Sequence, residues 1–287
     1  MLFRFLFLPT LIAAIPLLAT GLFAQATYTC ATNTPVSIAN AQTPQATGIN
    51  GPDTIVGFFF DNSIQHNHGF YRRADGIVHK YLVPGSSETY LYGINNTGTI
   101  VGAYDTHGFM RSGGTVTTID YPGAIVTTAT GINSTGAVVG SYSTGTEAGG
   151  YVWSGGTFTS TLQVPGAVST IPTAINDSGV IVGRFFTSNF NSQGFVFANG
   201  QYTTIDYPGA VDTQVGGINN FGVIVGSYTN IDGTGGGFVY KNGNFRSVVV
   251  PGTNSAAVGS INFKGDITGS VITSSGADEV FVGTNCQ

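Results

Sequence analysis

The sequence predicts an all-β fold, a six-bladed β-propeller of four-stranded antiparallel blades. Three observations predict it: a repeat with a period near 43 residues, two tight-turn signals in a typical copy, and chain ends that each offer part of one blade. The repeated pattern is Ile-Asn-x-x-Gly-x-apolar-x-Gly. Its asparagines are spaced 45, 38, 43, 43 and 43 residues apart, at Asn50, Asn95, Asn133, Asn176, Asn219 and Asn262.

One copy shows how four strands arise from the pattern. A turn at residues 219–222 separates two apolar segments, and a second turn at 241–243 follows an apolar segment at 237–240. Asn at the first turn position accepts backbone hydrogen bonds, and Asn-Gly is a strong hairpin signal. Two hairpins and one longer loop per period favour a propeller blade over a parallel β-helix, whose coils need crossover bends.

The chain ends predict how the ring closes. The sixth copy stops after its third strand, at residues 280–282, whereas a strand at about 34–40 precedes the first complete copy. We therefore expect the N-terminal strand to complete the last blade, which would remove exposed sheet edges. Cys30 and Cys286 are the two cysteines of the chain and flank the repeats, so we expect a disulfide between them.

The first 26 residues resemble a secretory signal peptide, with an apolar run followed by Ala-Gln-Ala at 24–26. Cleavage there would leave a single propeller domain at 27–287, either extracellular or periplasmic. No later apolar run is long enough to span a membrane. The net charge is −5 and charged residues make up 8% of the chain, so the basic footprint of a nucleic-acid-binding protein is absent. We expect a monomer without a cofactor.

Most recurring residues are interpreted as scaffold. We expect the aromatic residue of each third strand to pack between blades, and the turn asparagines to cap their turns rather than to bind a ligand. Asp120 and Asp206 occupy the same place in a repeated Thr-Thr-Ile-Asp-Tyr-Pro-Gly-Ala phrase. Because the other copies lack a carboxylate there, we expect both to face solvent on the outermost strand. The six aromatic positions are Phe70, Phe109, Tyr151, Phe195, Phe238 and Phe281.

Three phrases resemble the bacterial extracellular HAF-repeat family: His-Gly-Phe at 107–109, Gly-Ile-Asn-Ser-Thr-Gly at 131–136 and Val-Val-Gly at 138–140. The resemblance covers residues from about 34 to 282. Its Ile-Asn-x-x-Gly half is well matched, whereas the His-Ala-Phe half keeps histidine only at His68 and His107, with glycine in place of alanine. The resemblance implies an exported bacterial repeat protein. It transfers no catalytic residue, because the family has no established activity.

The candidate site lies on the loops that join the second and third strands of each copy. These loops differ in sequence, and we expect them to share one face of the ring, where binding residues tend to concentrate. The candidate ligand-binding residues are Asp61, His66, His68, Asp105, His107, Arg184 and Asp232. The first three, joined by His107, offer metal-ligand chemistry, and residues 230–233 hint at Ca²⁺. Neither set is complete enough to predict a metal site, and no catalytic residue is assigned.

Three functions remain open from the sequence. The favoured one is a secreted, non-catalytic protein that binds a glycan or a protein partner through the variable loops. The second is a secreted hydrolase or lyase that uses a central pocket, and the third is a structural component of the envelope. The absence of a readable nucleophile–base or nucleotide-binding motif favours a protein without catalytic activity. The enzyme alternative would draw on Glu88, Asp105, Arg184, Asp212 and Asp232.

Overall fold

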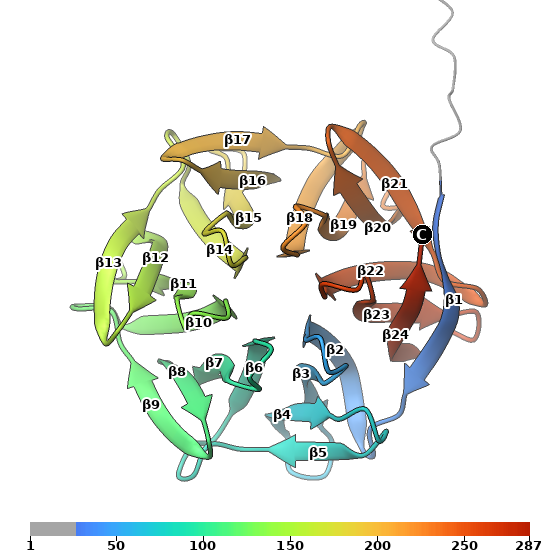
Figure 1. Ribbon diagram of the computed structural model, residues 1–287, viewed down its shortest axis with the longest axis horizontal. Helices are drawn as coiled ribbons and strands as arrows, with labels where there is room; N and C mark the ends of the chain where they lie inside the picture. Colours follow the sequence, from blue (N-terminus) through green and yellow to red (C-terminus); the bar gives the residue numbers. More distant parts are fainter. Residues whose placement is uncertain (1–26) are drawn as a thin grey trace, which may run out of the picture.

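The computed structural model describes residues 27–287, which form 24 β-strands around a central axis (Figure 1). The all-β prediction is therefore confirmed. The predicted signal peptide, residues 1–26, lies outside the described residues. Within 27–287, no helix has the length and apolarity needed to cross a membrane.

Four sheets each contain four antiparallel strands in sequence order. The first consists of β2 (Ala41–Ile49), β3 (Ile55–Asp61), β4 (His66–Arg72) and β5 (Val78–Tyr81). The second consists of β6 (Thr89–Ile94), β7 (Ile100–Tyr104), β8 (His107–Ser112) and β9 (Thr115–Ile119). The third consists of β10 (Val126–Ile132), β11 (Val138–Ser143), β12 (Ala148–Ser154) and β13 (Thr157–Leu162). The fourth consists of β14 (Ser169–Ile175), β15 (Ile181–Phe186), β16 (Ser192–Ala198) and β17 (Gln201–Ile205).

The other eight strands form one continuous sheet in the order β18-β19-β20-β21-β1-β24-β23-β22. Its first half consists of β18 (Ala210–Ile218), β19 (Ile224–Asn230), β20 (Gly235–Lys241) and β21 (Asn244–Val249). Its second half consists of β1 (Thr27–Val36), β24 (Asp278–Cys286), β23 (Ile267–Thr273) and β22 (Thr253–Ile261). The two halves lie beside each other on the right of Figure 1.

The prediction of six separate blades is therefore wrong: four sheets are independent four-stranded blades, and the remaining strands share one sheet. The cause is the length of β1. Residues 30–36 pair antiparallel with β24, whereas residues 27–29 pair parallel with residues 247–249 of β21. The strand predicted at about 34–40 thus begins earlier than expected, and its extra residues join the last two repeats edge to edge.

The predicted disulfide is confirmed. Cys30 and Cys286 are bonded across the β1–β24 pair, where they are also register partners. The bond joins residues separated by 256 positions and so ties the two ends of the ring together. Such a bond is compatible with an extracellular protein, because disulfides persist in oxidising compartments.

The six turn asparagines form a closed ring of hydrogen bonds. Each side-chain Nδ2 donates to the backbone oxygen of the next asparagine at 3.1–3.3 Å, and Asn262 donates back to Asn50. Each Oδ1 also accepts the backbone N–H four residues later, at 2.9–3.1 Å. All six side chains are buried. The asparagines therefore cap their turns, as predicted, and also join neighbouring repeats.

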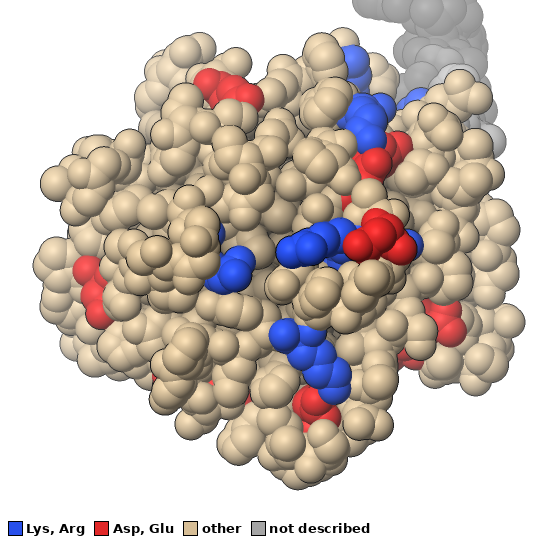
Figure 2. Space-filling model, turned by 60° about the horizontal axis from the view of Figure 1, so that its bottom comes forward, with Lys and Arg blue, Asp and Glu red and all other residues tan. Residues whose placement is uncertain are grey.

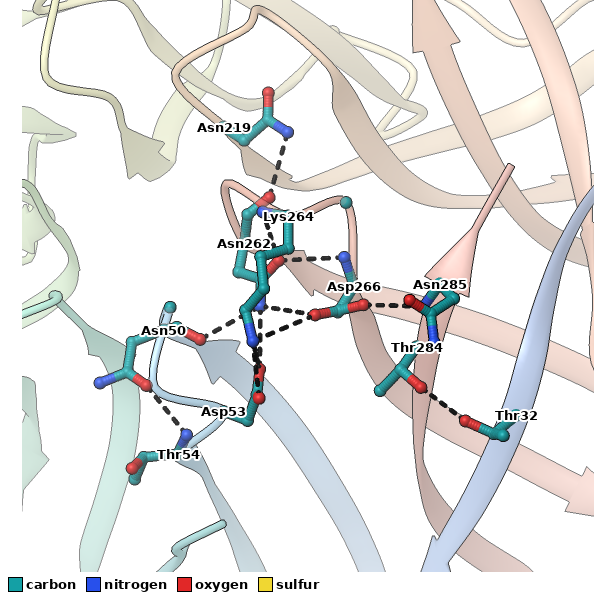
Figure 3. A network of polar contacts seen from close by, with 12 residues as sticks. Thr32, Asn50, Asp53, Thr54, Asn219, Asn262, Lys264, Asp266, Thr284 and Asn285 are labelled. Carbon is teal, nitrogen blue, oxygen red and sulfur yellow. Dashed lines mark hydrogen bonds and ion pairs between the residues drawn. The ribbon is translucent and has the colours of Figure 1, made fainter.

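Charged residues reinforce the ring where the first and last repeats meet (Figure 3). The Lys264 ammonium lies 2.7 Å from both carboxylate oxygens of Asp53 in the first turn. Buried Asp266 accepts the backbone N–H of Asn285 at 3.0 Å and the Nδ2 of Asn262 at 3.2 Å. These contacts join the first turn, the last turn and the C-terminal strand.

The third-strand aromatic residues are buried, so their predicted place in the core is confirmed. Each has a relative exposure of 2% or less. The glycine of the preceding strand makes room for this ring: a Cβ at Gly57 would lie 2.0 Å from the Gln45 backbone oxygen and 2.7 Å from the Phe70 ring. A side chain at this glycine would thus collide with both the inner strand and the core.

Replacing one ring asparagine should destabilise the protein. We expect Asn219→Ala to lower the free energy of unfolding by about 1–3 kcal/mol, because it removes the acceptor for two turn amides and the donor to Asn262. Urea unfolding followed by circular dichroism measures the change. Asn189→Ala, at an exposed loop position, is the matched control and should have little effect. Equal losses for the two variants would contradict a stabilising role of the ring.

Removing the disulfide should also destabilise the fold. The double variant Cys30→Ser/Cys286→Ser should lose about 2–5 kcal/mol, because the unfolded chain is no longer constrained by a loop of this length. The wild-type protein with and without reductant provides the comparison by thermal unfolding. An unchanged melting temperature would show that the β1–β24 hydrogen bonds hold the ends together without help from the bond.

Candidate ligand-binding channel and loop face

A cavity of about 730 Å³ lies between the innermost strands of the ring. Threonine and serine hydroxyls and the amides of Gln45 and Gln214 contribute most of its polar side chains. Tyr92 adds an aromatic ring, and Arg184 and Asp278 are the charged residues of the lining. A cavity of this size suits a ligand of a few rings, held by neutral polar groups and a small amount of charge.

The position three residues before each ring asparagine shapes the channel wall. Three threonines there donate to a backbone oxygen of the next repeat: Thr47 to Leu91 at 2.8 Å, Thr130 to Pro172 at 2.7 Å and Thr173 to Val215 at 2.9 Å. The other repeats depart from this pattern, so the channel is asymmetric although the ring is built from similar repeats. The six residues at this position are Thr47, Tyr92, Thr130, Thr173, Gly216 and Gly259.

Arg184 stands out in the position after the second-strand glycine. Its Nη1 donates to Gln214 Oε1 at 2.6 Å, and its guanidinium lies 5.9 Å from the Phe186 ring centroid. Its Nε is buried without a hydrogen-bond partner, and no ion pair involves Arg184 among the described residues. Residues at the equivalent position of the other repeats are Phe58, Ala103, Ser141, Ser227 and Ser270.

Burial shifts the pKa of the Arg184 guanidinium and that of the Tyr92 phenol in opposite directions. It lowers the pKa of Arg184, although an arginine remains protonated in proteins. It raises the pKa of Tyr92 to about 12, against the opposing influence of the Arg184 charge. At neutral pH the channel therefore presents a cationic guanidinium and a neutral phenol, which is a hydrogen-bond donor.

Of the seven predicted binding residues, Arg184 is the one that lines the channel. Asp61 is buried at the end of β3, where it accepts Lys80 Nζ at 2.6 Å and the backbone N–H of Ser63 at 2.9 Å. Lys80, and then Ser63, hold the pKa of Asp61 well below its ordinary value. This aspartate therefore stabilises its own loop.

The two candidate histidines, His66 and His68, lie in β4 and not in the loop, which is shorter than expected and spans residues 62–65. His66 is exposed. His68 packs edge-on against Phe59, with ring centroids 6.2 Å apart, and both of its ring nitrogens are buried without partners. Burial lowers the pKa of His68, which favours its neutral form.

The remaining predicted residues organise separate loops. Asp105 accepts the backbone N–H groups of Ser87 and Glu88 at 3.0 and 3.1 Å, and Asp232 accepts the backbone N–H of Thr234 at 3.0 Å. His107 pairs with Asp120 at 3.0 Å. The structure does not bring these side chains together. Among residues 27–287, no group of three or more His, Cys, Asp or Glu side chains is arranged to hold a metal ion.

The two repeated-phrase aspartates are exposed, as predicted, but each lies one residue after the end of its outer strand and not on it. Asp120 pairs with His107, and Asp206 accepts Gln193 Nε2 at 2.9 Å. The tyrosine that follows each aspartate stacks on a tyrosine of the second strand: Tyr121 on Tyr142 and Tyr207 on Tyr228, with ring centroids 3.8 and 3.6 Å apart. The phrase thus connects the end of one repeat's outer strand to the sheet of the next repeat.

Residue Phe190, which the sequence analysis did not single out, is the most unusual feature of the loops. It lies between β15 and β16 with a φ of 62° and a side chain that is 75% exposed. The β19–β20 and β23–β24 loops have the same backbone hydrogen bonds, but glycine occupies the matching position, as Gly233 and Gly276. A bulky residue in this backbone region is strained, and such strain is found at functional positions.

The repeated pattern could have identified Phe190 from the sequence alone. Aligning the three loops places a phenylalanine where two copies have the glycine that a positive φ requires. Exposed apolar side chains also occur in other loops between the second and third strands, at Ile64 (46% exposed) and Ile231 (89%). In the view of Figure 2, charged side chains are few and most of the surface is uncharged.

The comparisons with known proteins support the fold. No protein-family model matches the sequence, and no curated protein matches it. Among solved structures, the chain is similar to a putative gluconolactonase, with 14% identity over 89% of this chain and 92% of that one and a TM-score of 0.57. It is also similar to the β-propeller domain of the Trilobed protease from Pyrococcus furiosus, which has an open velcro topology (11% identity, 86% and 83% covered, TM-score 0.53).

A third similar structure is Aleuria aurantia lectin in complex with Fucα1-6GlcNAc, at 10% identity, with 87% of this chain and 93% of that one covered and a TM-score of 0.50. The described chain is therefore a β-propeller. At these identities the comparisons establish the architecture only, and the neighbours include both a lectin and an enzyme-like protein.

The Asp61 pair predicts a pH dependence of stability. Because the folded pKa is lower than the unfolded value of about 4, the ionised carboxylate stabilises the fold above that value, and this stabilisation is lost as the pH falls towards the folded pKa. Asp61→Asn should therefore reduce the free energy of unfolding by about 1–3 kcal/mol at pH 7 and by less at pH 3. Urea unfolding at both pH values measures the difference.

Asp75→Asn is the control for the Asp61 experiment. Asp75 is an exposed turn residue whose Oδ1 accepts the Ile77 N–H at 2.9 Å, a bond that asparagine can also make. Its variant should differ little from wild type at either pH. A loss at Asp61→Asn that is the same at pH 7 and pH 3 would contradict an ionised role for Asp61.

Proposed function

We propose that the protein is an exported, non-catalytic β-propeller that binds a glycan through the central channel and the adjoining loop face. The channel lining carries the proposal. Hydroxyls, two amides and the Tyr92 ring surround a cavity of about 730 Å³, and this mixture is suited to the hydroxyl groups and apolar ring faces of a sugar.

Export is supported by three features of the chain. The Cys30–Cys286 bond requires an oxidising environment to form and persist. The apolar leader at residues 1–26 and the resemblance to HAF repeats favour an extracellular or periplasmic protein of a bacterium.

Phe190 supports binding from the loop face. An exposed aromatic ring at a strained position offers a rigid apolar surface on which a sugar ring can stack. The backbone strain at Phe190 and the exposure of its ring both lower the stability of the unliganded protein. Glycine at the matching position of two other repeats avoids both costs. A ligand that covers the ring would offset the cost of exposure, which gives a physical reason for keeping phenylalanine at this position.

The proposal is tested with a glycan array followed by calorimetry on the glycans that bind. We expect binding to a restricted set of glycans, with Phe190→Ala weakening affinity about three- to tenfold, because one stacking contact is lost. Phe221→Ala is the matched control, since Phe221 is 67% exposed but lies in the ring-asparagine turns. Equal effects of the two variants, or an array without any bound glycan, would contradict the proposal.

The same residue predicts a trade-off between binding and stability. Phe190→Gly should raise the free energy of unfolding by up to about 1 kcal/mol while weakening glycan binding, because glycine adopts this backbone conformation without strain. Chemical unfolding and calorimetry on the same preparation measure both effects. A variant that loses stability would show that Phe190 contributes to folding instead.

A further inference from the structure

One repeat places a positive charge where the others place small or uncharged side chains. Five of the six residues after the second-strand glycine are Phe, Ala or Ser, and the fourth repeat has Arg184. Its side chain lines the channel beside Gln214, which comes from the innermost strand of the next repeat. The charge is therefore a feature of one side of the channel and is not required by the repeat.

The described protein does not neutralise this charge. The guanidinium donates a hydrogen bond to the neutral amide oxygen of Gln214, and the ion pairs of residues 27–287 involve other groups. Asp278 is the carboxylate that shares the channel lining, and it forms no ion pair with Arg184. Partial burial of an arginine costs solvation free energy. An anion or several acceptors offset this cost when they accept hydrogen bonds from the N–H groups of the guanidinium.

We propose that Arg184 binds an anionic group of the ligand, so that the glycan bound in the channel is acidic. This inference rests on the proposed function. The guanidinium would form a bidentate contact with a carboxylate or a sulfate ester, while Gln214 holds the side chain in place. Tyr92 offers a neutral hydroxyl in the same lining for a further hydrogen bond. Both anions present paired oxygens that match the arginine fork.

Calorimetry with matched tetrasaccharides tests the inference. The probes are an oligogalacturonate, its carboxyl-reduced galactose form and a sulfated galactan of equal length. For wild type we expect an acidic probe to bind about tenfold or more tightly than the reduced one, because a hydrogen bond to a charged group is stronger than one to a neutral group. The preference should weaken as salt is raised. Comparing the first and third probes distinguishes carboxylate from sulfate.

Variants assign the preference to one residue. Arg184→Gln should bind acidic and reduced probes equally, and Arg184→Lys should recover part of the preference, because it keeps the charge but loses the fork. Arg111→Gln is the control for net charge, since Arg111 packs over the Tyr81 ring at 5.0 Å and does not line the channel. It should behave like wild type. Thermal unfolding of each variant confirms that it is folded before binding is compared.

The outcomes separate this inference from the function on which it rests. Binding of acidic and reduced probes with equal affinity by wild type would overturn the inference and leave glycan binding intact. A preference that survives in Arg184→Gln would overturn the role of Arg184. Failure of the array and of all three probes would overturn the proposed function, and the inference with it.

Discussion

The closed ring of asparagine hydrogen bonds is the constraint on which the rest of the structure depends. Each asparagine fixes its own turn through Oδ1 and the next turn through Nδ2, so the position of every inner strand is coupled to its two neighbours. Such a chain of bonds satisfies every buried amide only if it closes on itself, because an open end would leave a donor and an acceptor unpaired. The channel is the space that this closed arrangement leaves along the axis.

The junction between the first and last repeats has contacts that the repeated pattern does not supply. There the first turn has Asp53 in place of glycine, and the last repeat supplies Lys264 and Asp266, which join it to the first turn and to β24. The N-terminal strand adds a second connection, because β1 pairs with both β24 and β21. The disulfide makes the same connection covalent. These features meet where an incomplete last repeat leaves strand edges to be covered.

The fourth repeat departs from its neighbours in ways that do not help folding. Arg184 lines the channel without an ionic partner, and Phe190 adopts a backbone conformation that two other repeats assign to glycine. Both lie on or next to one strand, β15, so they belong to a single hairpin. A rigid ring can accept such local costs because the asparagine and aromatic layers of the same repeat remain intact. The departures are the features that distinguish one side of the channel from the other.

The sequence by itself determined the all-β class, the turns, the buried aromatic layer and the pairing of Cys30 with Cys286, because each depends on local turn chemistry or on a repeated pattern. It did not determine the shared eight-stranded sheet, which depends on where the end of β1 meets β21 in space. The sequence also suggested that Asp61 and His107 belong to one binding site. In the structure the two side chains have different partners: His107 pairs with Asp120, whereas Asp61 pairs with Lys80. Only the tertiary structure placed Arg184, Gln214 and Tyr92 in one channel, because they come from three repeats whose side chains meet at the axis.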